Sequence, residues 1–248
     1  MNLILLRHGQ STWNLSNRFT GWKDVSLTQL GIDEATFSGN ALLENNFKIK
    51  SVYTSLLNRA IETTDIVTDI INFPKEEIKY EWRLNERHYG ALQGLNKSET
   101  AAKYGEDQVH IWRRSYDIPP PPLDFNDNRH PKFNDKFNKI STDLPIGESL
   151  KNVIDRLEPF WKEYMIHFRE STGDHLIVAH SNSLRAIVKL LDQLSEKEIT
   201  SVNIPTGVPL VYTFDIDLKV LNKKYLINQE ELEKKQEIIK NQGAIKKK

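Results

Sequence analysis

A histidine follows directly after the first apolar run of the chain. The run Leu3 to Leu6 is typical of a buried strand, and Arg7-His8-Gly9 comes at its end. Ligands of α/β sheets usually bind beyond the carboxyl ends of the strands. Neutral imidazole is a nitrogen nucleophile near pH 7, an arginine fork fits phosphate oxygens, and a glycine lets backbone amides approach an anion closely. These residues predict a phosphorylated histidine at His8, in preference to a histidine that only packs at a strand end.

A second histidine stands in an equivalent position further along the chain. The apolar run His175 to Ala179 predicts another strand, and His180 follows it. Between the two histidines, Arg59 lies in the first turn of a helix predicted from about Asn58 to Ile71. A helix N-terminus attracts anions, so the terminus and Arg59 favour the same kind of ligand.

Short β-rich runs alternate with helical periodicity along the chain, which favours a mostly parallel sheet with helices on both faces. The predicted strands are Leu3 to Leu6, Ser51 to Thr54, His175 to Ala179, and a terminal pair at Val211 to Phe214 and Leu221 to Leu226. The predicted helices are about Gln29 to Glu44, about Asn58 to Ile71, and one after His180. We expect a single three-layer α/β domain over residues 1–248, with no internal repeat.

Two segments lack this pattern. Residues from about 92 to 144 are polar, rich in Asn, Asp and Pro, and poor in sustained periodicity, so we expect an insertion that covers the site. Residues from about 229 to 248 form a charged tail, which is usually mobile. Water that reached a phosphohistidine would turn transfer into hydrolysis, so we expect both segments to close over the site.

The composition excludes several classes of protein. Lys and Arg number 34, as do Asp and Glu, so no global basic field attracts nucleic acid. The chain has no cysteine for a disulfide or thiolate metal site, and no apolar stretch approaches the roughly 18 residues of a membrane span. We expect a cytoplasmic protein without nucleic-acid or membrane partners. The remaining histidines are expected at the surface or in packing, without a metal: His88, His110, His130, His167 and His175.

Polar motifs elsewhere supply more charge. Glu86 lies among aromatic residues in the segment Leu84 to Gly90, and alone it is equally consistent with an ion-pair partner of Arg87 or Arg59. Lys97 and the pair Arg113-Arg114 lie in the predicted insertion, where a solvated face would be the simplest interpretation of the pair taken alone. Together with Arg7 and Arg59 they provide five cations.

The chain resembles the cofactor-dependent phosphoglycerate mutases of the histidine phosphatase superfamily over essentially its whole length. The resemblance rests on the motifs RHGQSTWN, RFTGW, TSLLNRAIET, LNERHYGALQGLNK, WRRSYDIPPPPL, GESL, AHSNSLRA and IPTGVPLVYTFD. Arg-His-Gly alone is shared with phosphatases, whereas LNERHYGALQGLNK and RRSYDIPPPP are far more specific to the mutases. The resemblance implies a phosphoglycerate mutase-like fold and the interconversion of 3-phosphoglycerate and 2-phosphoglycerate, in glycolysis and gluconeogenesis. It further implies priming by 2,3-bisphosphoglycerate, no metal ion, and a homodimer or homotetramer.

The resemblance also implies roles for individual residues. His8 would carry the phosphoryl group, Arg7, Arg59 and His180 would surround it, and Glu86 would be the general acid and base. Together with Arg7, Arg59 and Glu86, the residues that would hold the phosphoglycerate are Ser11, Asn14, Thr20, Gly21, Tyr89, Lys97, Arg113, Arg114, Ser181 and Asn182. Ser181 replaces the family's usual glycine, so its hydroxymethyl group is expected either to crowd the pocket or to require a backbone conformation that glycine tolerates better.

Elementary electrostatics agrees with these roles. Bisphosphoglycerate carries roughly −4 to −5 at neutral pH, and five cations can hold it without a metal. A cationic His180 would stabilise the transferring phosphoryl group. Two alternatives remain: a phosphatase of the same fold, in which water is the acceptor, and a catalytically silent binding scaffold.

Overall fold

The computed structural model describes residues 1–140 and 143–242. Six strands form one sheet in the order β3-β2-β4-β1-β5-β6. The strands are β1 (Asn2–Arg7), β2 (Ile49–Thr54), β3 (Lys79–Tyr80), β4 (Asp174–Ala179), β5 (Leu210–Phe214) and β6 (Val220–Tyr225). The pairs β1–β4, β2–β4 and β2–β3 are parallel, whereas β5 runs antiparallel to β1 and β6. The predicted mostly parallel sheet and its terminal strand pair are confirmed.

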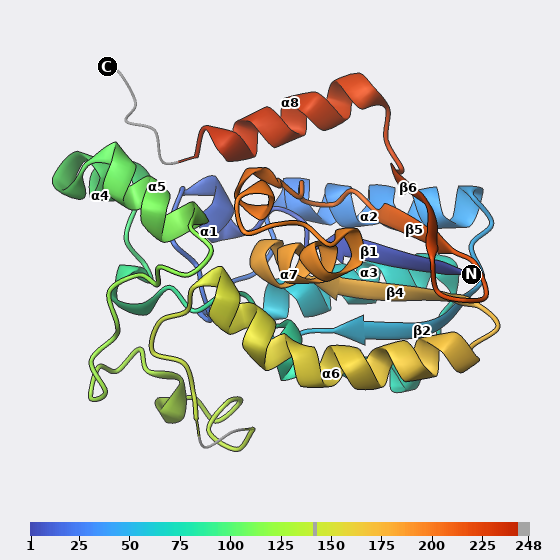
Figure 1. Cartoon of the computed structure of the whole chain (residues 1–248), viewed down its shortest axis with the longest axis horizontal. Coiled ribbons are helices and arrows are strands. Elements are labelled where there is room, and N and C mark those ends of the chain that lie inside the picture. Colours follow the sequence, from blue (N-terminus) through green and yellow to red (C-terminus); the bar gives the residue numbers. More distant parts are fainter. Residues whose placement is uncertain (141–142, 243–248) are drawn as a thin grey trace.

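Helices cover both faces of the sheet (Figure 1). They are α1 (Thr12–Leu15), α2 (Gln29–Glu44), α3 (Asn58–Ile71), α4 (Lys97–Tyr104), α5 (Glu106–Arg114), α6 (Leu150–Glu170), α7 (Ser181–Asp192) and α8 (Gln229–Lys240). Short 3₁₀ turns occupy Lys75–Glu77, Trp82–Leu84, Gly90–Leu92, Pro131–Phe133 and Glu198–Ser201. The predicted helix bounds of α2 and α3 agree with the structure.

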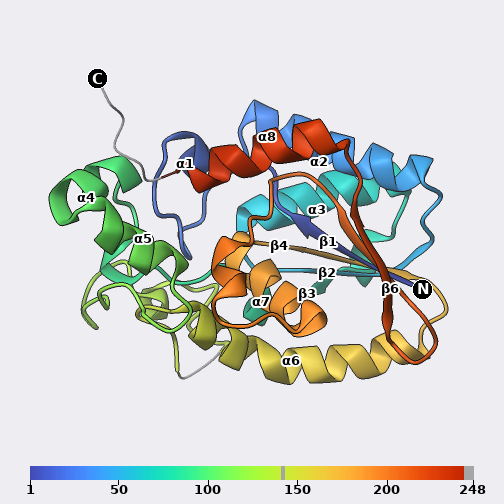
Figure 2. The ribbon, with the colours of Figure 1, turned by 45° about the horizontal axis from the view of Figure 1, so that its top comes forward.

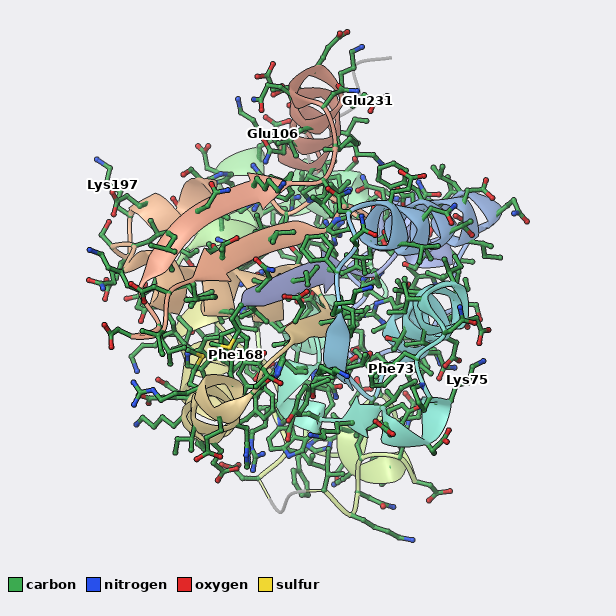
Figure 3. The ribbon with its side chains drawn as sticks, turned by 90° about the vertical axis from the view of Figure 1, so that its right-hand side faces the viewer. Phe73, Lys75, Glu106, Phe168, Lys197 and Glu231 are labelled. Carbon is green, nitrogen blue, oxygen red and sulfur yellow. The ribbon has the colours of Figure 1, made fainter. Side chains whose placement is uncertain are left out.

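Strand β1 shows why the sheet has two apolar faces. Its side chains alternate, so Leu3 and Leu5 pack with α6 and α7 while Ile4 and Leu6 pack with α2 and α3. Figure 3 looks onto this layered arrangement from the end where the chain begins, with the labelled Phe168 of α6 on the sheet side of its helix. Phe168 is fully buried.

Three helical segments differ from the sequence-based expectation. The predicted insertion contains α4 and α5, and the tail contains α8, which begins after an Asn228 cap. Each of these helices buries only two or three residues, so their apolar periodicity is weak. Helix α6 is absent from the predicted elements, although its buried residues recur at helical spacing behind a Ser149 capping box. Residues 141–142 of the insertion and 243–248 of the tail lie outside the described residues.

The carboxyl ends of the parallel strands face α4, α5 and the end of α8, on the left in Figures 1 and 2. The sheet and its helices therefore present one end of the domain to the segments that were expected to cover it. No helix among residues 1–140 and 143–242 is both long enough and apolar enough to cross a membrane.

Candidate active site

The two histidines predicted at strand ends lie next to each other. Strands β1 and β4 are neighbours, and the backbone N–H of His8 donates to the Ala179 carbonyl across 3.0 Å. The rings of His8 and His180 are 4.9 Å apart, centroid to centroid. Both histidines are buried, so they form a desolvated pair at the carboxyl ends of two central strands.

The hydrogen bonds of His8 fix its tautomer. The Nε–H of Arg59 donates to His8 Nε2 across 3.2 Å, and a guanidinium has no acceptor, so Nε2 carries a lone pair. The hydrogen of the neutral ring then lies on Nδ1, which donates to the Gly9 carbonyl across 2.7 Å. Burial and the cations Arg59 and Arg7 hold the pKa of His8 well below 6.5. His8 is therefore neutral at neutral pH, with the lone pair of its ring on Nε2.

Gly9 is required at the turn after His8 by close packing. A Cβ at this position would lie 2.1 Å from the Gly31 carbonyl oxygen at the start of α2. The Gly9 N–H donates to Thr63 Oγ1 of α3. The turn is thus held between two helices, and with it the direction of the His8 ring.

Arg59 is held by the turn that was predicted to bind phosphoglycerate. Its Nη1 and Nη2 donate to the carbonyls of Lys23 and Gly21 across 3.1 and 3.0 Å. Gly21 has a positive φ of 54°, which suits glycine. Burial lowers the pKa of Arg59 to about 10, and Glu86 opposes this, so the guanidinium stays charged at neutral pH.

The surroundings of His180 favour its neutral ring over the cationic imidazole that the sequence led us to expect. Burial is the first cause that holds its pKa well below 6.5, followed by Arg59 and His8. Its Nε2 is hydrogen bonded to Ser55 Oγ across 2.7 Å. Its Nδ1 is buried without a partner among the described residues. The sequence could place this ring at the strand end but could not reveal the desolvation and the cations around it.

Glu86 is a buried carboxylate held by amides. Its Oε1 accepts from the Arg87 N–H across 2.7 Å and from Asn182 Nδ2 across 2.8 Å. No ion pair with the side chain of Arg87 or Arg59 is found in the part of the chain that the structure describes, which makes that alternative wrong. The carboxylate therefore sits in the pocket with Coulombic rather than contact interactions with its cations.

The pocket is strongly cationic. Seven arginine and lysine side chains line it: Arg7, Arg18, Arg59, Lys97, Arg113, Arg114 and Arg185. Burial, followed by Arg113, Arg7 and Arg114, holds the pKa of Lys97 well below 10.5. Burial also lowers the pKa of Arg113 to about 10. Desolvated cations that repel one another are stabilised by a multiply charged anion.

Helix α8 closes one side of this pocket. Ile239 and Gln242 are among its lining residues, and Lys97 Nζ donates to Gln242 Oε1 across 3.0 Å. Lys235 forms a 2.7 Å ion pair with the buried Glu34 of α2. Figure 2 shows α8 alongside α1 and α2, with its end near α5. A segment expected to be a mobile tail is thus helical and packed against the site as far as residue 242.

Comparison with known proteins gives the family. Residues 3–126 and 124–223 match the model of the histidine phosphatase superfamily, branch 1. The chain belongs to the histidine phosphatase superfamily. A 2,3-bisphosphoglycerate-dependent phosphoglycerate mutase of Parabacteroides distasonis is 48% identical over 99% of both chains. A second protein of that name, numbered 2, from Bacteroides thetaiotaomicron is 49% identical over 98% of this chain and 99% of its own.

Solved structures share the fold at low sequence identity. A mycobacterial glucosyl-3-phosphoglycerate phosphatase complexed with VO3 matches with a TM-score of 0.68 at 21% identity, covering 92% of this chain and 98% of its own. The α-ribazole phosphatase of Shigella flexneri matches with a TM-score of 0.65 at 19% identity, covering 90% and 95%.

Most of the residues predicted for the site line one pocket of the protein. They are Arg7, His8, Asn14, Thr20, Arg59, Glu86, Tyr89, Lys97, Arg113, Arg114, Ser181 and Asn182. Ser11 and Gly21 do not line it. Ser11 caps α1 and is hydrogen bonded to Asn14, and the Gly21 carbonyl accepts from Arg59. Each therefore contacts a residue that lines the pocket without lining it itself. His180 lies behind His8.

Ser181 does not have the backbone strain that its replacement of glycine suggested. It is the first residue of α7, and its φ is not positive. A serine is well accommodated at a helix start, so no conformation reserved for glycine is needed. Its side chain lines the pocket.

Four lining residues were missed from the sequence: Arg18, Arg185, Ile239 and Gln242. The AHSNSLRA motif contains Arg185, but the surrounding apolar periodicity suggested only a packed helix. Ile239 and Gln242 lie in the charged tail, where no local pattern signals a buried contact.

Unpartnered donors indicate the ligand class of the site. Arg7 Nε and Arg185 Nε are buried without partners within the described residues. Buried donors without partners are costly, and phosphate oxygens would satisfy them. Among residues 1–140 and 143–242, no group of three His, Cys, Asp or Glu side chains could hold a metal ion. The donors present therefore fit a phosphorylated anion such as 2,3-bisphosphoglycerate.

Proposed function

We propose that the chain interconverts 3-phosphoglycerate and 2-phosphoglycerate through a phosphohistidine at His8. One observation carries the proposal: the neutral nucleophile His8, the Glu86 carboxylate and seven arginine and lysine side chains line a single pocket. The names of the similar mutases support the same substrate class. Bound 2,3-bisphosphoglycerate supplies the phosphoryl group that first occupies His8.

Different residues of the pocket would carry out the separate parts of phosphoryl transfer. His8 Nε2 forms the N–P bond as the P–O bond to the sugar acid breaks, and the reverse step returns the group to the other hydroxyl. Arg7, Arg59 and His180 surround the ring and would hold the equatorial phosphoryl oxygens. Glu86 would give a proton to the departing oxygen and take one from the attacking hydroxyl, a role worth about 10² to 10⁴-fold.

The rest of the pocket would hold the second phosphate and the carboxylate. Lys97, Arg113 and Arg114 form a second group of cations on α4 and α5. A bound polyanion would raise the pKa of Lys97 towards its usual value. A site that only hydrolyses a phosphate has less need of this second group, which favours the mutase over the phosphatase alternative.

One assay tests the proposal against both alternatives. The protein receives 3-phosphoglycerate with a trace of 2,3-bisphosphoglycerate and no metal, and 2-phosphoglycerate is measured against free phosphate. Mostly isomer is expected. Mostly free phosphate would make the protein a phosphatase, and neither product would make it a binding scaffold. His8→Ala should abolish both the activity and the acid-labile protein phosphate.

The proposal includes a cytoplasmic location and a homodimer or homotetramer, both drawn from the resemblance to glycolytic mutases. Sedimentation velocity at micromolar protein would measure the assembly. A monomer under those conditions would contradict it.

A further inference from the structure

Arg185 is a buried arginine of α7 that contacts Asn182, a partner of Glu86. Its side chain is 1% exposed and lines the pocket. Nη1 donates to Asn182 Oδ1 across 2.9 Å, and Nη2 donates to the Ile199 carbonyl across 2.6 Å. The two residues are three positions apart on the helix, so they share one face. Burying a guanidinium for packing alone is costly, which calls for a reason in the site.

The bond from Arg185 decides which way the Asn182 amide faces. An asparagine side chain can present either oxygen or nitrogen to a neighbour, and the two orientations are sterically similar. Arg185 only donates, so it holds Oδ1 on its own side. Nδ2 is then directed to Glu86 Oε1 across 2.8 Å and to the Tyr89 hydroxyl across 3.3 Å. The opposite orientation would set an amide oxygen against a carboxylate oxygen.

The two oxygens of Glu86 are consequently unequal. Oε1 accepts from the Arg87 N–H, from Asn182 Nδ2 and, at 3.3 Å, from the Asn182 N–H. Within the described residues no donor contacts Oε2. One oxygen is thus saturated, and the other is free to exchange a proton with a ligand.

We propose that Arg185 is a positioning residue for Glu86, acting through the orientation of Asn182 so that Oε2 is the oxygen that exchanges the proton. The inference rests on the proposed mutase function and assigns to Arg185 a part in it. Arg185 forms no hydrogen bond with Glu86 itself within the described residues, and its two guanidinium nitrogens Nη1 and Nη2 bond to Asn182 and Ile199. Its bond to Ile199 is a separate, structural contact that ties α7 to the loop before β5.

A double-mutant cycle tests the relay. The variants are Arg185→Gln, Asn182→Ala and the two combined, with kcat for isomerisation and the melting temperature as measurements. Each single variant is expected to lower kcat about 10- to 100-fold, because a displacement of about 1 Å at the reacting centre has that effect. The double variant should be no slower than Asn182→Ala alone. Losses that multiply, or an Arg185→Gln kcat within about threefold of the parent, would overturn the proposal.

A second variant separates positioning from stability. Arg185→Lys keeps a cationic donor that can reach Asn182 but loses the fork that also reaches Ile199. It should recover most of kcat while melting no higher than Arg185→Gln, and failure to recover kcat in a folded protein would contradict the relay. Lys189→Gln is the matched control, since Lys189 lies one turn further along α7 and donates to the Leu194 carbonyl outside the pocket. It should leave kcat unchanged.

Isomerisation by the unaltered protein distinguishes a failure of the proposed mutase function from a failure of the proposed role of Arg185. Absence of isomerisation by the unaltered chain would remove the proposed function and the relay with it. Isomerisation by the parent together with multiplying losses in the cycle would remove the relay alone.

Discussion

The Nε–H of Arg59 donates to His8 Nε2, the atom that forms the bond to phosphorus in the proposed reaction. The guanidinium therefore lies in the direction from which a phosphoryl group would approach. The bond keeps the hydrogen of the ring on Nδ1 and the lone pair on Nε2. A ligand has to replace this one contact, and its oxygens then become acceptors for the same guanidinium.

Replacing Arg59 should change both the titration and the activity of His8. The pKa of His8 is held low by burial and by two cations, so the ring should stay neutral at the pH of about 6.5 where a free imidazole is half protonated. In Arg59→Met one cation is lost and the pKa rises, while kcat/KM should fall about 100-fold because a phosphate donor is missing. Nitrogen chemical shifts of the ring, assigned with His8→Gln, measure the first effect. A ring that protonates near pH 6.5 in the parent protein would contradict the geometry.

The ion pair between Lys235 and Glu34 attaches α8 to α2 beside the site. Such a partly buried pair contributes about 1 kcal/mol, so Lys235→Ala should raise the ratio of hydrolysis to transfer about fivefold. In this variant Glu34 still accepts hydrogen bonds from the Gln10 N–H and the Thr206 hydroxyl. We therefore expect the lost interaction to affect only the attachment of α8. Free phosphate and 2-phosphoglycerate are measured in the same reaction.

The neighbouring residue provides the control for this experiment. Lys234 pairs with Glu230 on the solvent side of α8, where both side chains are exposed, and Lys234→Ala should leave the ratio unchanged. Removal of residues 236–248 should raise the ratio further, because it takes away Ile239 and Gln242. An unchanged ratio after that deletion would rule out α8 as a cover.

Ser181→Gly should alter substrate binding little. Ser181 has a helical backbone and not a left-handed one, so glycine relieves no strain and the backbone N–H of α7 remains available. We expect KM within about threefold of the parent, equivalent to well under 1 kcal/mol. Ser181→Ala distinguishes the roles of the hydroxyl and the added volume. A large change in KM for both variants would mean that the hydroxyl binds the ligand.

The site shows what local sequence can and cannot predict. An apolar run followed by a polar residue predicts a strand end, so His8 and His180 could be placed at strand ends from the sequence. That β1 and β4 are neighbours depends on the packing of the whole sheet. The contact of Lys97 with Gln242 joins residues 145 apart, and no local pattern predicts it.

Charge states were harder to predict than positions. The sequence supplies a histidine near several arginines, and only burial and distance show that the neutral ring of His180 is favoured. Arg185 was overlooked because it lies among the apolar positions of α7, where a packed helix explains the pattern. A charged residue on an apolar helix face is a usable signal for such a role, because burying it unpaired is costly.

His88 predicts how the loop that carries Glu86 responds to acid. His88 lies two residues after Glu86 in the sequence and is fully buried. Its Nδ1 accepts from the Gly90 N–H across 3.1 Å. Burial, followed by the cationic neighbours His130, Arg156 and Arg129, lowers its pKa to about 3. In the unfolded chain the ring titrates near 6.5. Below that pH the unfolded state binds a proton that the folded state does not, so stability falls as the pH decreases towards 3.

The expected contribution is a loss of about 1.4 kcal/mol per pH unit between about pH 6 and pH 4. In His88→Asn the amide oxygen can still accept from Gly90 and does not titrate, so the free energy of unfolding should fall less steeply over this range. Urea unfolding at several pH values measures how steeply the free energy of unfolding changes with pH in each protein. The carboxylates are the same in both, so their contribution to the pH dependence cancels in the comparison. The absolute stability of the variant is expected to be lower because the ring leaves a cavity beside Trp22. Equal slopes would mean that the folded protein protonates His88 as readily as the unfolded chain. Protonation would use the Nδ1 lone pair that accepts from the Gly90 N–H, and burial disfavours the charged ring.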